Sequence, residues 1–464
     1  MKIHSMTQQE KVAYMLSEPV PRLVCRMAVP TIISMLISSF YNMADTFFVG
    51  KLNTQATAAV GVVFSVMTLI QAAGFFFGHG SGNFISRNLG AQNYEEVNKM
   101  AATGFYTAFG AGILVALLGI FFIDPLAVLL GSTPTILPYT RSYLRIILLG
   151  APFMMSSLVL NNQLRYQGSA SYGMLGIVSG AVLNLVLDPL LIFYFDMGVS
   201  GAALATTISQ MGSFFILFAM SRQGGNIRIQ WKNISLKSYY FKEMVRGGFP
   251  SLCRQGLASV STICLNNCAG LYGGAFSDAA IAAMSIVNRV YMFANSALIG
   301  FGQGFQPVCG MNYGAKQYKR VREAFHFCVK YAIFLLVAAS LAGIVFARPL
   351  VTLFRKDDAQ VIEIATLALQ LRCIVFPLSS WMVMTNMMLQ SIGKAVSASL
   401  AAAARQGLFF IPLIFVLPYF FGLLGVQMCQ TWADVCAFIL TLPLGLHALK
   451  EMKGLEQTSQ GING

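Results

Sequence analysis

Three aspartates lie within long apolar segments of the chain, namely Asp45, Asp188 and Asp434. An aspartate at the centre of a membrane-spanning helix costs about 2.5–3.5 kcal/mol on insertion scales, so an acid in this position is a candidate for function. The alternative for Asp45 and Asp188 is that they hydrogen-bond neighbouring helices and fix their packing. For Asp434 this structural role is favoured, because its neighbours Trp432 and Cys436 do not indicate a site.

The surroundings of Asp188 predict a place for a cation. Asn184 precedes Asp188 by four residues and shares its helix face. Pro189 follows directly and leaves the carbonyl of Leu185 without its usual donor. Thr206 reaches a similar depth in the next apolar segment. These oxygens suit Na⁺ and a buried carboxylate suits H⁺, so we expect one of these two ions to bind here and favour H⁺. Asn184 and Thr206 alternatively join helices by hydrogen bonds.

Other side chains at membrane depth are candidates for contact with a substrate. Tyr41 lies one turn before Asp45 and could offer its ring to a cationic ligand. Met155 lies in a methionine-rich segment, and methionine adapts to varied ligands, although core filling is the favoured explanation for any single methionine. Arg405 lies inside an apolar segment, where it either pairs with an acid or lines a cavity.

The elements that position these residues are predicted to be membrane-spanning helices. The chain has 464 residues, of which 56% are hydrophobic and 10% charged, whereas soluble proteins carry about 25% charged residues. Apolar runs long enough to cross about 30 Å of hydrocarbon recur along it. Twelve spans are predicted, at residues 24–48, 57–79, 100–122, 140–162, 172–194, 201–221, 250–271, 281–303, 326–346, 364–388, 397–418 and 423–446.

The distribution of basic residues predicts the orientation. The net charge is +14, but Lys and Arg lie between the apolar runs and concentrate on one side, so they indicate topology rather than a surface for nucleic acid. Both termini are therefore expected in the cytoplasm. Residues 1–21 are polar and lack the pattern of a signal peptide. The polar stretch 221–249 predicts a cytoplasmic linker between a six-helix bundle at 1–220 and another at 250–464.

The two halves resemble each other in sequence. Gly90–Tyr94 matches Gly314–Tyr318, and Gly198 matches Gly422 at the same spacing along the chain, which we call the repeat offset. Six helices per copy place both copies in the same direction, which predicts two bundles related by a pseudo-two-fold axis along the membrane normal. The expected fold is thus an all-α integral membrane protein with a central cleft suited to alternating access. The acids are not duplicated, because the position equivalent to Asp188 lies near Ile411.

Several motifs carry a resemblance to a known family. They are Pro30…Asp45-Thr46…Gly50, the Asn-Leu-Gly-Ala-Gln loop at 88–92, Asn184-x-x-x-Asp188-Pro189, and Gly198-Val-Ser-Gly201-Ala-Ala-x-Ala-Thr206. Over essentially its whole length the chain resembles the multidrug and toxic compound extrusion (MATE) family, and it looks closest to the bacterial branch with DinF-type and MepA-type exporters. The NorM-type branch typically has an acid in helix seven, whereas the stretch 250–271 here has none.

The resemblance implies a cation-driven exporter of small amphipathic, often cationic molecules. It implies a cation site at Asp45, Asn184, Asp188 and Thr206, and a place near the drug cavity for Asn161. It also implies a multi-pass protein of the bacterial inner membrane, in contact with lipids and expected to be a monomer. No cofactor is expected, and no metal beyond a possible Na⁺, because the His and Cys residues form no recognisable metal motif.

Two other functions compete with export. The first is flipping of a lipid-linked precursor, which needs a cationic central cavity, and here Arg254 and Arg405 are among few cations at membrane depth. The second is a membrane-embedded enzyme, which ranks lower because no His/Asp/Ser constellation lies in the spans. The glycine-rich segment 78–82 lacks the ending of a phosphate-binding loop and more simply permits close packing of helices.

Overall fold

The computed structural model describes residues 6–274, 277–354 and 358–461, and this part of the chain contains helices and turns but no strand. The helices, of which η2 and η5 are π-helical and η3 is 3₁₀, are α1 (Gln8–Ser17), α2 (Val20–Val49), α3 (Thr54–Gly90), α4 (Tyr94–Phe121), α5 (Ile123–Leu129), α6 (Leu137–Tyr166), α7 (Ala170–Pro189), η2 (Leu190–Tyr194), α8 (Gly198–Ser221), η3 (Trp231–Asn233), α9 (Ser238–Tyr272), α10 (Ser277–Gly314), α11 (Tyr318–Val345), α12 (Ala347–Phe354), α13 (Ala359–Val375), α14 (Leu378–Ser391), α15 (Ala395–Ala403), η5 (Ala404–Phe409), α16 (Phe410–Phe421) and α17 (Leu423–Gly461).

The twelve predicted spans correspond to twelve helical segments of the structure. Among the described residues, nine helical segments are long and apolar enough to cross a membrane, and α13 with α14, bent by 58°, forms a tenth. The other two are α9 and α10, which are 35 and 38 residues long and carry polar residues at membrane depth, among them Arg254 and Arg289. The fold is therefore the predicted all-α membrane architecture.

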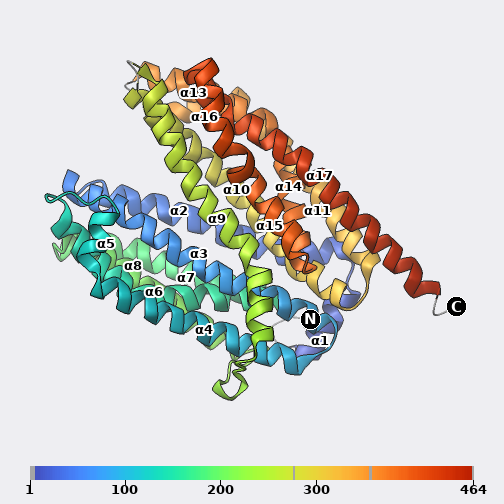
Figure 1. Ribbon diagram of the computed structural model, residues 1–464. Coiled ribbons are helices and arrows are strands. Elements are labelled where there is room, and N and C mark those ends of the chain that lie inside the picture. Colours follow the sequence, from blue (N-terminus) through green and yellow to red (C-terminus); the bar gives the residue numbers. More distant parts are fainter. Residues whose placement is uncertain (1–5, 275–276, 355–357, 462–464) are drawn as a thin grey trace.

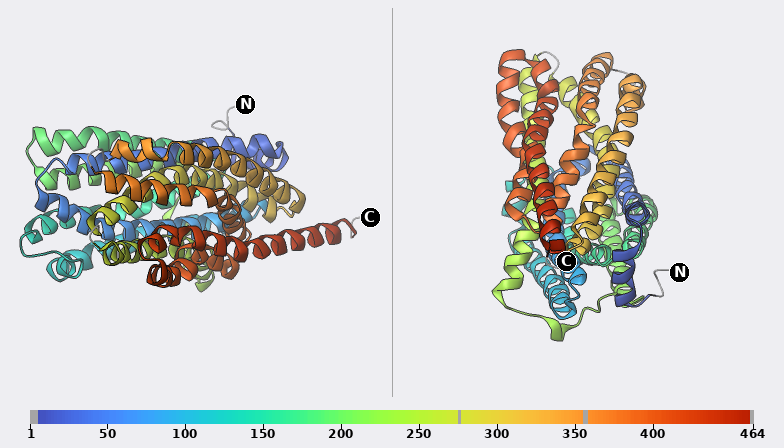
Figure 2. Two further views of the ribbon diagram at one scale, coloured as in Figure 1. Left: turned by 90° about the horizontal axis from the view of Figure 1, so that it is seen from above. Right: turned by 90° about the vertical axis from the view of Figure 1, so that its right-hand side faces the viewer.

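The helices form two bundles (Figure 1), and the twelve segments divide into six from α2 to α8 and six from α9 to α17. We call α2 to α8 the first lobe and α9 to α17 the second lobe. Both chain termini lie at one end of the molecule, which we call the terminus end, and the lobes diverge toward the opposite end (Figure 1). The last turns of α17 extend past the rest of the molecule at the terminus end (Figure 2).

The internal repeat is visible in the backbone as well as in the sequence. Gln92 and Lys316, which are related by the repeat offset, both adopt a φ of 59°, which residues other than glycine rarely do. The turns around them close with equivalent hydrogen bonds, from the Asn93 amide to the Asn88 carbonyl and from the Gln317 amide to the Asn312 carbonyl. The two lobes are thus copies of one backbone design.

The lobes approach each other closely where glycines lie at the terminus end. A Cβ added at Gly90 would lie 1.9 Å from the carbonyl oxygen of Met311, and one at Gly314 would lie 1.9 Å from that of Arg87. Gly304 is similarly close to the backbone of Ala28. Only glycine permits such approach of two helix backbones, which explains why glycines related by the repeat offset recur in both halves.

Hydrogen bonds between the lobes run from the terminus end to the middle part of the helices. Thr31 of α2 donates to the carbonyl of Gly300 at 2.7 Å, and Arg87 of α3 donates to Glu243 of α9 at 3.1 Å. Of the interlobe bonds formed by α2, the one farthest from the terminus end joins the hydroxyls of Ser39 and Ser296 at 2.6 Å. The lobes are therefore bonded together at this end.

The polar segments at the terminus end are folded against the lobes. Residues 222–237, with η3, connect α8 to α9, and α9 begins inside the predicted linker because buried Tyr240 and Met244 give its first turns an apolar face. Helix α1 contacts both lobes. Its buried Lys11 donates to Ser169 at 2.9 Å and Asn226 at 2.7 Å, while Arg320 donates to the carbonyl of Glu18 at its C-terminus at 2.6 Å. The division into bundles at 220 and 250 stays a prediction.

Alanine at either closest glycine is expected to disrupt the contact between the lobes. Gly90→Ala or Gly314→Ala places a methyl group against a carbonyl of the other lobe, and overpacking of this kind costs about 1–3 kcal/mol. The midpoint of thermal unfolding of the purified protein should fall. Alkylation of the fully buried Cys309, read by mass spectrometry, should rise because Cys309 lies in the same interface.

Gly61→Ala is the matched control on the same helix as Gly90. Nothing lies within 4 Å of a Cβ at Gly61, and alanine is the better helix former, so this variant should be at least as stable as the natural protein. Equal unfolding midpoints for Gly61→Ala and Gly90→Ala would show that the glycines are not required for the approach of the lobes.

The docking of α1 is expected to depend on pH through Lys11. Burial lowers the pKa of Lys11 from 10.5 to about 8. At pH values between these two pKa values, Lys11 of an undocked α1 binds a proton that Lys11 of the docked helix does not. Docking therefore becomes stronger as pH rises from about 8 to about 10.5. Protection factors of the α1 amides in hydrogen exchange, corrected for the intrinsic rate, should increase over this range. In Lys11→Met the increase should be absent, and an unchanged increase would assign it to another group.

Candidate cation and substrate site

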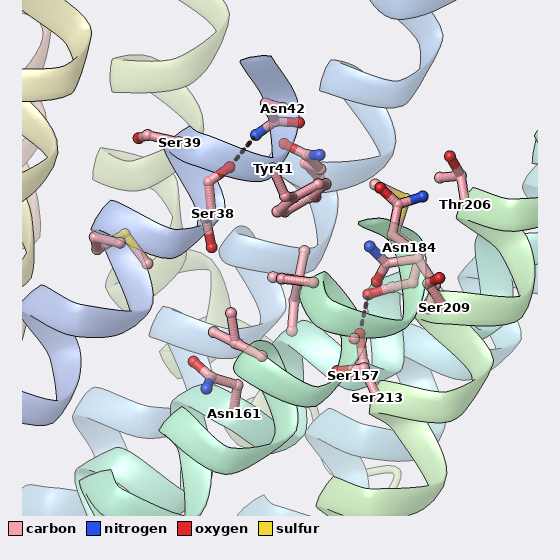
Figure 3. Close-up of a pocket in the computed structure, with 18 of the residues that line it drawn as sticks. Ser38, Ser39, Tyr41, Asn42, Ser157, Asn161, Asn184, Thr206, Ser209 and Ser213 are labelled. Carbon is pink, nitrogen blue, oxygen red and sulfur yellow. Dashed lines mark hydrogen bonds between the residues drawn. The ribbon is translucent and has the colours of Figure 1, made fainter. Parts of the chain in front are cut away.

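The first lobe contains a cavity of about 200 Å³ that is lined by both polar and apolar side chains (Figure 3). Tyr41 and Asn42 of α2 face Asn184 of α7 and Thr206 of α8 across it. The other lining residues are mostly serines, amides and methionines, contributed by α2, α3, α6, α7 and α8 together with Ser296 of α10, and they include Met35, Ser38, Ser39, Gln71, Met154, Ser157, Asn161, Ser209, Gln210 and Ser213. A cavity with hydroxyl, amide and thioether groups suits an amphipathic ligand better than a purely apolar one.

Two carboxylates flank this cavity. Asp188 is fully buried one turn beyond Asn184, whose amide donates to its Oδ1 at 3.3 Å. Asp45 lies one turn beyond Tyr41 and interacts electrostatically with Asp188. Within the described part of the chain, neither Asp45 Oδ1 nor Asp188 Oδ2 has a hydrogen-bond partner, although both atoms are buried. Two buried acceptors without donors form an arrangement that a proton or a small cation would complete.

Local irregularities of α7 and α8 create this geometry. Pro189 ends α7, and the chain continues into the π-helical turn η2 rather than a regular helix. A Cβ added at Gly201 of α8 would lie 2.6 Å from the carbonyl oxygen of Leu191 in that turn. The absence of a side chain at Gly201 therefore lets α8 pack onto η2, which places Thr206 beside Asn184 at the cavity.

Tyr143 is a member of the site that was not predicted from the sequence. It comes from α6, is fully buried, interacts electrostatically with Asp45 and Asp188, and hydrogen-bonds Thr206. Its hydroxyl also lies 3.9 Å from the sulfur of Met67. The available signal was its position near the outer end of the fourth predicted span, the same depth as the acids. A buried tyrosine hydroxyl at this place can exchange hydrogen bonds with a carboxylate.

The remaining predicted residues lie in different places. Asn161 lines the cavity, and its amide donates to the carbonyl of Gly173 at 2.9 Å. Met155 is buried beside Met154, and it is Met154 that is found among the lining residues. Arg405 lies in the second lobe, outside this cavity.

Arg405 pairs with Asp434, one of the two roles considered for it. Its Nε lies 2.7 Å from Asp434 Oδ1 and its Nη2 lies 2.9 Å from Oδ2, and Gln430 donates to Oδ1 at 2.7 Å. Arg405 also donates to the hydroxyl of Tyr291. The carboxylate of Asp434 is fully buried, so this bidentate pair satisfies both of its oxygens.

The ion pair occupies the place in the second lobe that corresponds to the cavity of the first. At the repeat offset, Thr206 and Gln210 correspond to Gln430 and Asp434. Gly168 and Gly393 both have positive φ and take equivalent places in the two lobes. The same separation along the chain relates Gly180, which lines the cavity, to Arg405. Small or neutral residues in one lobe are thus replaced by a charged pair in the other.

The oxygen atoms around Asp45 and Asp188 could hold a small hard cation, together with the carbonyls freed at the end of α7. No group of three or more His, Cys, Asp or Glu side chains with metal-binding geometry is found in the residues that the structure describes. The first-lobe site has two carboxylates and otherwise neutral donors, a set that fits a proton or Na⁺ rather than a tightly held transition metal.

Comparisons with known proteins agree with this architecture. The MatE family model matches residues 30–190 and 255–416, one segment in each lobe. The multidrug export protein MepA of Staphylococcus aureus (strain MRSA252) is 29% identical over 464 residues, covering 98% of this chain and 100% of that protein. MepA of Staphylococcus haemolyticus (strain JCSC1435) is 29% identical over 436 residues, covering 93% of this chain and 95% of that protein.

Solved structures are similar over nearly the whole chain. A MATE transporter in complex with MaL6 superimposes with a TM-score of 0.89 at 25% identity, covering 95% of this chain and 99% of that one. An outward-facing multidrug resistance MATE transporter of the MOP superfamily superimposes with a TM-score of 0.88 at 25% identity, covering 95% and 98%. With both lobes matched by the family model, this chain belongs to the MatE family, the multidrug and toxic compound extrusion transporters.

Proposed function

We propose that this chain exports small amphipathic, often cationic molecules from a bacterial cell, driven by the inward movement of a cation. The observation that carries the proposal is the pair of carboxylates Asp45 and Asp188 next to the cavity of the first lobe. Each has a buried oxygen without a hydrogen-bond partner among the described residues. The names of the MepA relatives describe multidrug export, which supports the same substrate class.

The proposed orientation follows the basic residues. The terminus end faces the cytoplasm and the diverging ends of the lobes face outward, so that the bonded arrangement is the one open to the outside. In this orientation the first-lobe site lies in the outer part of the bundle and is reached by cations from outside. The inward drive is about 2.3 kcal/mol per charge per 100 mV of membrane potential.

Exchange follows if ion and drug compete for the first lobe. A cation or proton at Asp45 and Asp188 removes the negative charge beside the cavity and so weakens its hold on a cationic substrate. Asp45 and the cavity residue Tyr41 lie on α2, so a change in the pairing of the acids also shifts or bends that helix at the cavity wall. Return to a state open to the cytoplasm then requires release of the contacts at the terminus end.

H⁺ is favoured over Na⁺ as the coupling ion. Two carboxylates that interact in an apolar bundle can share one proton. A proton bound by either would also supply the donor that the unpartnered oxygens of Asp45 and Asp188 lack. Na⁺ remains the competing coupling ion, because the same oxygens and those of Asn184 and Thr206 could coordinate it.

Asp45→Asn and Asp188→Asn are expected to abolish gradient-driven export. Each removes a charge while nearly preserving shape, so transport of an ethidium-like cation in proteoliposomes should slow at least about tenfold, which corresponds to about 1.4 kcal/mol or more in the activation free energy of transport. The proton gradient and the sodium gradient are imposed separately. Export by the natural protein under the proton gradient alone identifies H⁺ as the coupling ion.

Asp124→Asn is the control for the loss of one acid. Asp124 lies at the outer end of α4 and α5 in an exposed pair with Arg141 at 2.7 Å, so its neutralisation should leave export unchanged. Full gradient-driven export by both Asp45→Asn and Asp188→Asn would refute the assignment of the coupling site.

A further inference from the structure

The second lobe contains a buried guanidinium that the proposed export cycle does not use. Arg372 of α13 is 7% exposed, and its guanidinium carbon lies 3.6 Å from the centre of the Tyr291 ring. Its Nη1 donates to Asn288 at 2.6 Å. The contact with Tyr291 is a cation–π interaction, and the contact with Asn288 is a hydrogen bond to a neutral group, so neither supplies a negative charge.

The charges around Arg372 do not balance. Arg405 lies on the same tyrosine, with its guanidinium carbon 5.1 Å from the ring centre, and the carboxylate of Asp434 is fully engaged by Arg405 and Gln430. No carboxylate of the described residues lies within ion-pair distance of Arg372. In this cluster of described side chains, two cations therefore share one anion.

One polar atom of this cluster points to a missing partner. The Nε of Arg372 is buried and has no hydrogen-bond partner among the described residues. The free-energy cost of burying a guanidinium without a counter-charge exceeds what a cation–π contact returns. A small anion at this nitrogen would satisfy the donor and neutralise the excess charge at once.

We infer that the second lobe binds a monovalent anion at Arg372, beside Tyr291 and the Arg405–Asp434 pair. The anion is a chloride ion or the carboxylate of a bound molecule, since both accept from a guanidinium and carry one negative charge. The Arg405–Asp434 pair beside this site corresponds in the internal repeat to residues that line the first-lobe cavity, which lies next to the two acids Asp45 and Asp188. One lobe would then bind a cation and the other an anion at related places in the same backbone.

Binding is tested with the purified full chain by thermal unfolding. Chloride and acetate are titrated separately into a sulfate buffer of constant ionic strength. A saturable rise of the unfolding midpoint is expected with at least one of them, since a ligand that binds only the folded state stabilises it. A response to chloride alone indicates a free halide, and a response to acetate indicates the carboxylate of a molecule. No saturable response to either anion overturns the inference.

Substitutions of Arg372 test whether the rise of the unfolding midpoint comes from an anion bound at this residue. Arg372→Gln should remove it, whereas Arg145→Gln, which removes an exposed arginine from the first lobe, should retain it in full. Arg372→Lys keeps the charge but not the planar fork, and should raise the anion concentration for half-maximal stabilisation at least about tenfold. This second variant decides the question if Arg372→Gln does not fold. A titration of either Arg372 variant identical to that of the natural protein also overturns the inference.

Discussion

Ionisable side chains enclosed in apolar bundles are the constraint on which the other features of this molecule depend. A buried charge is costly unless a partner or a ligand compensates it. The second lobe compensates Asp434 internally, through the two bonds from Arg405 and one from Gln430. The first lobe leaves Asp45 and Asp188 with oxygens that no described side chain bonds. The buried charge is therefore compensated by neighbouring side chains in one lobe, whereas in the other lobe oxygens of the two acids remain without partners beside a cavity.

The backbone irregularities lie where these charges are. Pro189 and the π-helical turn η2 follow Asp188, and the π-helical segment η5 contains Arg405. Broken helices at membrane depth are tolerated where neighbouring protein covers the freed backbone groups. At η2 this cover comes from α8, because Gly201 lies against the carbonyl of Leu191. The irregular turns are thus part of the packing that holds the polar groups in place.

The sequence was sufficient for the spans and the repeat because both depend on local composition. Hydropathy located all twelve helical segments, and the repeat offset reappears as matching φ angles at Gln92 and Lys316. The break between α13 and α14 was missed, since the predicted span 364–388 runs through it without interruption. Pro377 at the break was the local signal for it.

Contacts between helices were harder to predict from the sequence. Asn184 and Thr206 were found by depth and helix face, but Tyr143 was not, because nothing in its local sequence shows that α6 turns it toward Asp188. For Arg405 the sequence left pairing and cavity lining open, since Asp434 lies 29 residues away on another helix. The distance along the chain hides such pairs, and only the packed structure brings them together.

Helix α2 links the proposed coupling site to the contact between the lobes. Asp45 lies near one end of it, while Thr31 and Ser39 on the same helix bond Gly300 and Ser296 of the second lobe. A helix transmits a shift or a bend along its length because its backbone hydrogen bonds resist local change. If the proposed cation binding alters α2 at Asp45, the change reaches the bonds of Ser39 and Thr31 that join the lobes. The cavity residues Tyr41 and Asn42 lie between these two regions, so a substrate there occupies the segment through which the change must pass. This placement gives a physical reason why ion and substrate would exclude each other without direct competition for the same atoms.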